Sequence, residues 1–215
     1  MIQFTPYWWQ DQPQYRNTEV LPAKADCIVV GAGFTGLSAA LTMAKAGRQV
    51  IVLDSEAIGF GASTRNGGML GSGHKVSVDA AKKYYGPDIA AQLHCEANAS
   101  LAFTKSLILN HNIDCELQDC GRLRTAWTPQ GFIAMAGANT SLQKIEPFAA
   151  HMVQPDEMAQ HIDTQLYFGG LLYENHASVQ PRKLHYGLLQ LAVEAGVQVF
   201  GGQPVLEVNA QLDGF

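Results

Sequence analysis

The chain of 215 residues is 47% hydrophobic and only 15% charged, so it can bury a substantial core, and this composition excludes an intrinsically disordered protein. A formal net charge of −5 argues against a nucleic-acid partner, because proteins that bind nucleic acid need a basic surface. No run of 18 apolar residues is present, so the sequence predicts no transmembrane segment. The four cysteines show no C-x-x-C spacing and residues 1–14 contain no basic leader region, which together favour reduced thiols and a cytoplasmic protein.

The first elements in chain order include a strand–helix–strand unit. Residues 1–24 hold three prolines and the aromatic run Tyr7–Trp9, and we expect an extended arm whose aromatic rings pack onto the body of the protein. Asp26–Val30 has the apolar pattern of a buried strand, Leu37–Ala46 is rich in the helix formers Ala and Leu, and Gln49–Leu53 is a second strand rich in β-branched residues. These three segments together have the length of a βαβ unit, which is about 30 residues.

The rest of the chain continues this alternation of helices and strands. A loop with six glycines covers residues 59–73. Further helices are predicted over residues 78–85, 87–110, 129–149, 155–161 and 181–195, and further strands over residues 121–127, 169–173, 197–200 and 205–208. The alternation indicates an α/β fold class.

The turn Gly31-Ala-Gly-Phe-Thr-Gly36 joins the first strand to the first helix and has the spacing of a dinucleotide-binding turn. Gly31 allows a sharp turn, Gly33 lets a pyrophosphate approach the backbone, and Gly36 lets the helix lie close to the strand. A glycine-rich turn without a ligand is the alternative. The preceding strand, the following helix and the acidic residue at the end of the second strand favour a bound dinucleotide.

That acidic residue is Asp54, 23 positions after Gly31. A carboxylate there can accept hydrogen bonds from the hydroxyls of the adenosine ribose, and it disfavours the 2′-phosphate of NADP. The turn alone does not distinguish FAD from NAD. An NAD-dependent dehydrogenase built on the same βαβ unit therefore stays open as an alternative.

A second glycine-rich stretch, Gly59-Phe-Gly-Ala-Ser-Thr-Arg-Asn-Gly-Gly68, follows the second strand. Ser63 and Asn66 offer neutral hydrogen bonds, and Arg65 offers a planar cation for a phosphate. A cofactor too long for the first turn alone would explain such a loop. The alternative is a flexible surface loop with a solvated arginine.

At this point the sequence resembles the FAD-dependent oxidoreductases of the D-amino-acid oxidase superfamily. The run from Ala25 to Ala40, which contains the turn, is typical of these proteins. The loop from Ile58 to Gly68 resembles that of the branch containing γ-glutamylputrescine oxidoreductases, as does Tyr7-Trp8-Trp9. A weaker match covers Ala177–Pro181 with Leu184, and then Gly196–Val199 and Pro204-Val205.

The resemblance implies a Rossmann-like FAD/NAD(P)-binding βαβ domain with part of an α+β substrate domain. It places the N-terminal arm rich in aromatic residues and proline over 1–24, the FAD-binding βαβ unit with the glycine-rich loop over 25–80, the helical substrate-domain portion over 81–175 and the return to the FAD domain over 176–215. The implied cofactor-binding residues are Gly31, Gly33, Phe34, Thr35, Gly36, Asp54, Ser55, Gly61, Ala62, Ser63, Arg65, Asn66, Gly67, Gly68 and Val205. Val205 would meet the adenine through its backbone.

The implied reaction is oxidation of the C–N bond of a small-molecule amine or amino acid by hydride transfer to flavin N5, with oxygen or a quinone as electron acceptor. The residues identify no catalytic base: His74 could face the flavin or be solvated, and no histidine or cysteine spacing indicates a metal site. Family members continue well beyond the position of Phe215, so we expect an N-terminal portion with open strand edges. A truncated nucleotide-binding fragment without turnover is the alternative function.

Overall fold

A computed structural model describes residues 4–10, 14–210 and 214. Within the predicted N-terminal arm, residues 1–3 and 11–13 lie outside the described residues, as do residues 211–213 and 215 of the predicted return segment. The chain divides into two compact units. The first unit comprises Met1–Gly68, Asn112–Glu116 and Gln180–Phe215, and the second unit comprises Met69–His111 and Leu117–Val179.

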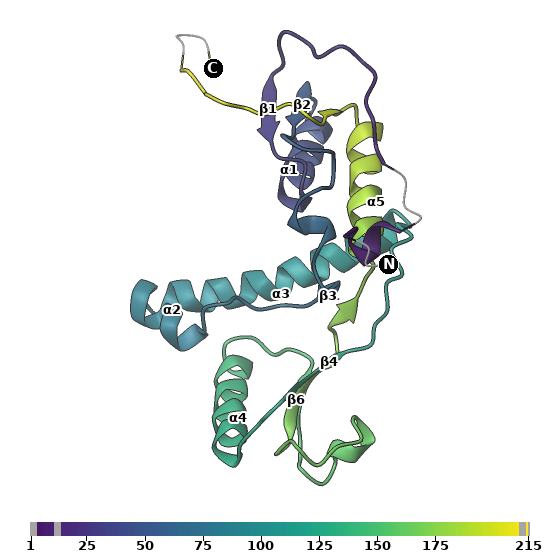
Figure 1. Cartoon of the computed structure of the whole chain (residues 1–215). Helices are drawn as coiled ribbons and strands as arrows, with labels where there is room; N and C mark the ends of the chain where they lie inside the picture. The colour runs from purple at the N-terminus through teal and green to yellow at the C-terminus, as the bar shows by residue number, and fades with distance from the viewer. Residues whose placement is uncertain (1–3, 11–13, 211–213, 215) are drawn as a thin grey trace. The chain divides into compact units, whose positions relative to one another are not determined.

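The first unit is built on a parallel sheet with the order β1-β2-β8 (Figure 1). These strands are β1 (Cys27–Val30), β2 (Val50–Leu53) and β8 (Gln198–Phe200). Helix α1 (Phe34–Lys45) connects β1 to β2, and α5 (Pro181–Glu194) packs against α1. The α/β class, the βαβ unit and the parallel sheet are therefore confirmed.

The core of the first unit is apolar and closely follows the predicted pattern. Val50 and Val52 of β2 and Leu37 of α1 are buried, as is Leu189 of α5. Among the described residues β1 pairs only with β2, and Ile28 and Val30 of this strand are 58% and 62% exposed. This strand is therefore an open edge of the sheet, and the prediction that Asp26–Val30 is a buried strand is wrong for Ile28 and Val30, because no described strand pairs with β1 on its other side.

The second unit holds an antiparallel sheet with the order β4-β6-β5. Its strands are β4 (Arg122–Thr125), β5 (Ala150–Val153) and β6 (Gly170–Tyr173), and a separate pair is formed by β3 (Met69–Leu70) and β7 (Ala177–Ser178). The helices are α2 (Val78–Tyr85), α3 (Pro87–Asn110), α4 (Pro129–Gln143) and the short 3-10 helix η3 (Met158–Gln160). Within the described ranges, the apolar stretch of every helix falls short of what a membrane-crossing span needs.

The helices begin where the sequence provides capping side chains. Ser77 accepts the N–H of Ala80 at the start of α2, and Thr128 accepts the N–H of Gly131 at the start of α4. Gln180 does the same for α5. Proline occupies the first helical position of α3, α4 and α5, where a missing N–H costs nothing.

Three predicted elements are wrong in the structure. The helix from 129 ends at Gln143 rather than at 149, and the residues that follow include strand β5. The helix predicted over 155–161 is only the 3-10 turn η3. The strand predicted over 205–208 is absent from the described residues, and Leu206 there is 92% exposed, because no neighbouring strand pairs with it.

Candidate cofactor site

The turn that joins β1 to α1 is built on glycines. Gly31 has a φ of +97°, which side chains rarely adopt, and its N–H donates to the carbonyl oxygen of Leu53 at 2.7 Å. A Cβ atom at Gly36 would overlap the carbonyl oxygen of Gly31 and lie 3.3 Å from Cγ1 of Val29. These two glycines therefore allow the chain to turn tightly and the helix to approach the strand.

The first turn of α1 has backbone N–H groups that a ligand could use. The N–H of Phe34 donates to Oγ of Ser63 at 3.0 Å. Within the described part of the chain, the N–H groups of Thr35 and Gly36 have no acceptor. A Cβ atom at Gly33 would lie 3.0 Å from Oγ of Ser63, so the missing side chain keeps this space open. The partial positive charge of a helix N-terminus favours an anion such as a phosphate at this position.

Asp54 ties the end of β2 to the turn. Its Oδ2 accepts the N–H of Ala32 at 2.8 Å, and its Oδ1 accepts the N–H of Glu56 at 3.0 Å. A carboxylate has about four lone-pair sites, so each oxygen keeps capacity for another donor such as a ribose hydroxyl. The side chain is half-buried, which leaves it accessible to a ligand at the turn.

The glycine-rich loop is held by its own hydrogen bonds. It contains the 3-10 turn η2 (Ala62–Thr64). Thr64 is fully buried, and its Oγ1 donates to the carbonyl oxygen of Gly59 at 2.6 Å. Asn66 donates through Nδ2 to the carbonyl oxygen of Ser63 at 3.0 Å and accepts the N–H of Gly68 at 2.8 Å. These bonds give the loop a defined conformation.

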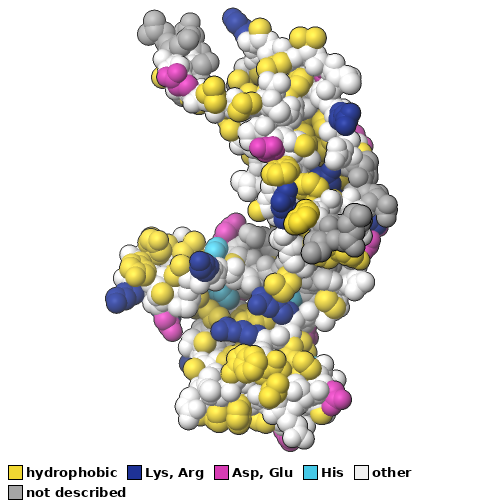
Figure 2. Space-filling model, in the orientation of Figure 1, with side chains coloured by type: hydrophobic (Ala, Val, Ile, Leu, Met, Phe, Trp, Pro, Cys, Tyr) yellow, Lys and Arg dark blue, Asp and Glu magenta, His cyan; other side chains and the backbone are white. Residues whose placement is uncertain are grey.

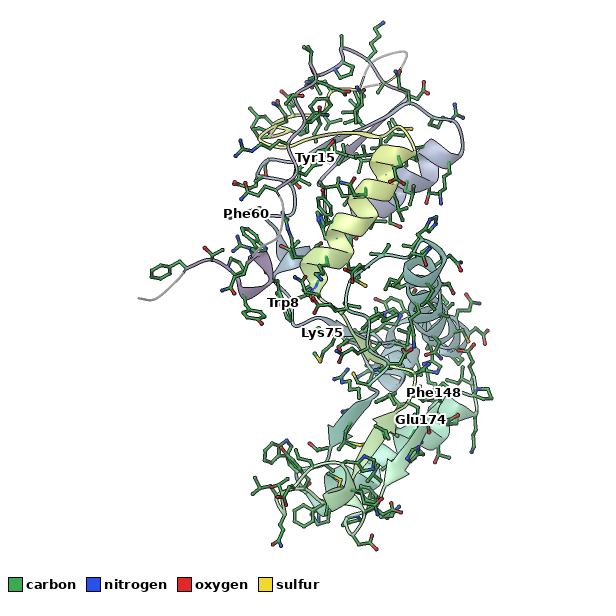
Figure 3. The ribbon with its side chains drawn as sticks, turned by 90° about the vertical axis from the view of Figure 1, so that its right-hand side faces the viewer. Trp8, Tyr15, Phe60, Lys75, Phe148 and Glu174 are labelled. Atoms are coloured by element: carbon green, nitrogen blue, oxygen red, sulfur yellow. The ribbon has the colours of Figure 1, made fainter. Side chains whose placement is uncertain are left out.

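The aromatic 3-10 turn η1 (Tyr7–Trp9) contacts this loop (Figure 3). Nε1 of Trp9 donates to Oγ1 of Thr64 at 2.8 Å, and Nε1 of Trp8 donates to the carbonyl oxygen of Asn66 at 2.7 Å. The prediction that N-terminal aromatics pack onto the body is thus confirmed for the two tryptophans. Tyr7 is 74% exposed.

The guanidinium group of Arg65 lies over the ring of Trp9 and over that of Phe60, a residue of the loop. Its guanidinium carbon is 4.7 Å from the ring centre of Trp9 and 4.1 Å from that of Phe60, and its Nε donates to the carbonyl oxygen of Phe60 at 2.6 Å. Cations over aromatic faces are stabilised by the ring quadrupole. Arg65 therefore holds η1 against the loop, whereas its expected contact with a phosphate stays a prediction.

Helix α5 supports the turn through two buried side chains that the sequence analysis assigned no role. His185 is 1% exposed, and its Nε2 donates to the carbonyl oxygen of Ala32 at 2.7 Å. Arg182 donates through Nη1 to the carbonyl oxygen of Ile58 at 3.1 Å. Burial lowers the pKa of His185. A signal was present, because His185 falls on the same helical stripe as the buried Leu189.

The remaining predicted residues surround this centre less closely. Ser55, Gly61, Ala62 and Gly67 are exposed, and Gly68 has a φ of +71°. Val205 lies two residues after Gln203, whose N–H donates to the carbonyl oxygen of Asp54 at 2.8 Å. The structure thus brings the turn, Asp54 and Ser63 together, and it leads the chain back past Asp54 just before Val205.

The arrangement is a binding site rather than a set of reacting side chains. No group of three histidine, cysteine or acidic residues among the described ranges could hold a metal ion. His74 donates through Nε2 to the carbonyl oxygen of Leu93 at 2.9 Å. The glycines, free N–H groups and carboxylate suit a dinucleotide, whose pyrophosphate and ribose need these partners.

A family model described as FAD dependent oxidoreductase matches residues 26–215. The chain is 31% identical over 185 residues to a probable oxidoreductase OrdL of Haemophilus influenzae. This match covers 86% of this chain and 43% of the relative. The chain is also 30% identical to γ-glutamylputrescine oxidoreductase of Escherichia coli, with 86% and 42% covered. The chain thus spans less than half the length of these relatives.

Solved structures share the fold at lower sequence identity. Glycine oxidase from Geobacillus kaustophilus matches with a TM-score of 0.70 and 20% identity, covering 86% of this chain and 48% of that one. L-amino acid deaminase from Proteus vulgaris matches with a TM-score of 0.73 and 17% identity, covering 92% and 50%. The chain therefore shares its fold with these two enzymes.

Proposed function

Because the chain belongs to the family of FAD-dependent oxidoreductases, we propose that it binds FAD at the β1–α1 turn and serves oxidation of the C–N bond of an amine or amino acid. The observation that carries the proposal is the turn itself, where Gly36 lets the helix approach the strand and Thr35 and Gly36 keep free N–H groups. FAD is the cofactor of this family. We assign the cofactor to the first unit and substrate contacts to the second.

The pyrophosphate of FAD would lie at the N-terminus of α1. The N–H groups of Thr35 and Gly36 would donate to its oxygens, and Gly33 provides the room for close approach. Oγ of Ser63, which already accepts the N–H of Phe34, can donate its own proton to a phosphate oxygen. The loop would in this way contribute to the same phosphate site as the helix.

The adenosine ribose would bind at Asp54. The two backbone N–H groups that this carboxylate already accepts fix its orientation, so its remaining lone pairs face the ligand without a further loss of side-chain freedom. A negatively charged partner also disfavours a 2′-phosphate. Val205 follows two residues after Gln203, whose N–H donates to the carbonyl oxygen of Asp54, and it is assigned to the adenine.

The flavin end would be served by the glycine-rich loop. Trp8 donates to the backbone carbonyl of Asn66 and Trp9 to the side-chain hydroxyl of Thr64, and these bonds hold the loop in one conformation before the cofactor arrives. Gly67 has open space at its Cβ position, which permits a ring system close to the backbone. The loop thus acts as a preorganised surface, to which Arg65 would add a cation for a phosphate.

The substrate assignment rests on the names of the relatives, among which are a γ-glutamylputrescine oxidoreductase and a glycine oxidase. When bound, FAD would supply the two-electron acceptor, at N5, for a hydride from the carbon that carries the amine. We assign the described residues at the turn to positioning the cofactor and give none of them the role of catalytic acid or base, because Asp54 and His185 are both bonded to the backbone of Ala32. Oxygen or a quinone is the proposed terminal acceptor, and a cytoplasmic location is proposed from the cysteine usage alone.

A titration of the purified chain tests this function. FAD binding, followed by visible absorption and by quenching of flavin fluorescence, is expected to saturate, whereas NAD should not compete. Gly33→Val should abolish binding, because its side chain would occupy the pyrophosphate space. Gly137→Val is the matched control, since this glycine of α4 has open space at its Cβ position. Binding of NAD but not FAD would overturn the cofactor assignment, and bound FAD that no amine or amino acid reduces would overturn the substrate assignment alone.

A further inference from the structure

A cavity of about 630 Å³ lies within the second unit, and none of its lining residues is assigned to FAD above. Its walls come from the segment that leads into α2, from α3, from β4 and β6, and from α4. Small-molecule sites in proteins commonly have volumes of about 300–1,000 Å³. The cavity is therefore large enough for a metabolite, and its side chains determine which kind.

Two arginines of β4 line the cavity. Arg122 and Arg124 are separated by one residue, so they project from the same face of the sheet as Tyr173, the β6 partner of Arg122. Neither guanidinium forms an ion pair or a side-chain hydrogen bond with another described residue. Unpaired guanidinium groups side by side can bind carboxylate or phosphate oxygens with two parallel hydrogen bonds each.

A third cationic side chain lines the cavity, and the acidic side chain that lines it already lies near a lysine. Lys75 (labelled in Figure 3) lines the cavity and has no ion pair among the described residues. Asp79 also lines it but is 84% exposed and lies 3.6 Å from Nζ of Lys82. Figure 2 shows basic and histidine side chains gathered on this part of the surface. In a chain with a net charge of −5, this local excess of positive charge requires an explanation.

Two buried histidines belong to the same wall. His94 is 8% exposed and His176 is 2% exposed. Tyr173 stacks on His176 with 4.6 Å between ring centres, and Phe148 (Figure 3) stacks on Tyr173 and meets the ring of His94 at 5.5 Å. A continuous row of rings therefore fixes both imidazoles in place.

These imidazoles have unused hydrogen-bonding capacity. The N–H of Ser72 donates to Nε2 of His176 at 3.1 Å, so the neutral ring carries its proton on Nδ1, which has no partner in the described structure. Nε2 of His94 is likewise without a partner. Burial lowers the pKa of both histidines, and the charge of Arg122 lowers that of His176 further. Both nitrogens are buried, and Nδ1 of His176 faces the chain at Gly71. The imidazoles therefore shape and polarise the wall, while Arg122, Arg124 and Lys75 are the groups that a ligand can reach.

We infer that this cavity binds a small organic anion through its carboxylate or phosphate oxygens. Arg122 and Arg124 would make the direct contacts, and Lys75 would add charge. The inference deepens the proposed function and rests on its assignment of substrate contacts to the second unit, but it does not depend on FAD, because every residue that carries it lies in that unit and anion binding can fail while FAD still binds. It concerns binding and involves no chemical step.

The test uses calorimetric titration of the 215-residue chain with succinate, inorganic phosphate and the uncharged analogue succinamide. At least one of the two anions should bind, with affinity falling as salt is raised, and succinamide should not. Arg122→Gln combined with Arg124→Gln should weaken binding at least about tenfold. Lys144→Gln is the matched control, because this exposed lysine removes one positive charge outside the cavity and should leave the affinity nearly unchanged.

A second readout needs no substitution. In ¹H–¹³C NMR spectra the ring signals of His94 and His176 should shift with the same dissociation constant as the calorimetric titration. Saturation by succinate alone or by phosphate alone would identify the anion class. Absence of binding by both anions, equal binding by the arginine double variant and the control, or binding that leaves both histidine signals in place would each overturn the inference.

Discussion

Replacing Asp54 by alanine removes one side chain that serves both the fold and the proposed cofactor. The carboxylate accepts the N–H of Ala32 at 2.8 Å and that of Glu56 at 3.0 Å. Ala32 is 1% exposed, so water cannot easily replace the lost acceptor, whereas the exposed Glu56 can bond to water instead. The first hydrogen bond therefore dominates the expected loss.

A hydrogen bond to a charged group contributes about 1.5–3 kcal/mol, and we expect Asp54→Ala to lower the free energy of unfolding by about that amount. The ribose would lose a charge-assisted acceptor as well, which corresponds to a reduction in FAD affinity of about 10- to 150-fold. Glu56→Ala removes a neighbouring exposed carboxylate that forms no side-chain hydrogen bond in the described structure. This control should change neither quantity appreciably.

Urea unfolding of the FAD-free protein measures the first effect, and titration with FAD measures the second. The two readouts separate the roles of Asp54, because stability is measured without the cofactor. If Asp54→Ala unfolds at the same urea concentration as the control, the bond to Ala32 does not have the value assigned to it. If its FAD affinity also equals that of the control, Asp54 does not contact the ribose.

Trp9→Phe should lower the free energy of unfolding by about 0.5–1.5 kcal/mol and weaken FAD binding, because one hydrogen bond from η1 to the loop is lost; Tyr7→Phe, at a largely exposed position, should match the unchanged protein in both titrations. Gly36→Ala should cost about 1–3 kcal/mol relative to Gly137→Ala in thermal unfolding, since both are helical glycines and only the first would overlap backbone; equal melting temperatures would contradict this. Because burial lowers the pKa of His185, the unfolded chain binds more protons below a pH of about 6.5, so stability should fall as pH decreases through that range and His185→Gln should reduce the slope. A denaturation series at several pH values that shows rising stability on acidification would refute it.

The first βαβ unit could be predicted because local and long-range requirements agree there. The residues of strand Cys27–Val30 are apolar throughout, and the following helix is rich in the helix formers Ala and Leu, so each segment favours one kind of secondary structure. Gly31 and Gly36 occur where a tight turn and close helix packing require them. The bounds of α2 and α3 were also predicted to the residue. In these segments propensity, capping and burial all indicate the same structure.

Elements defined by partners far along the chain were harder to predict. Strand β5 (Ala150–Val153) was missed because nothing in its four residues distinguishes it from the end of a helix, and its conformation depends on pairing with β6. Helix α4 ends early, where Gln143 bonds to the backbone of Phe148 through both ends of its amide. Such side-chain contacts across a bend leave no periodic signal.

The residues of the candidate site also divide into those that local spacing predicts and those that depend on contacts between distant parts of the chain. Gly31, Gly36, Asp54 and Ser63 could be identified from spacing, because the turn imposes a local geometry on them. The supporting role of His185 depends on helix α5 lying beside the turn, which is a tertiary contact between residues 153 positions apart. Its burial on an apolar helical stripe was the available signal.

The proposed role of the β1–α1 turn is to hold FAD. Its most direct test is the stoichiometry and spectrum of flavin bound to the purified protein after incubation with FAD and removal of excess cofactor. We expect one FAD per chain in the unchanged protein and in Gly137→Val, and none in Gly33→Val. Protein that remains colourless after incubation, or equal flavin content in all three proteins, would contradict the assignment of FAD to this turn.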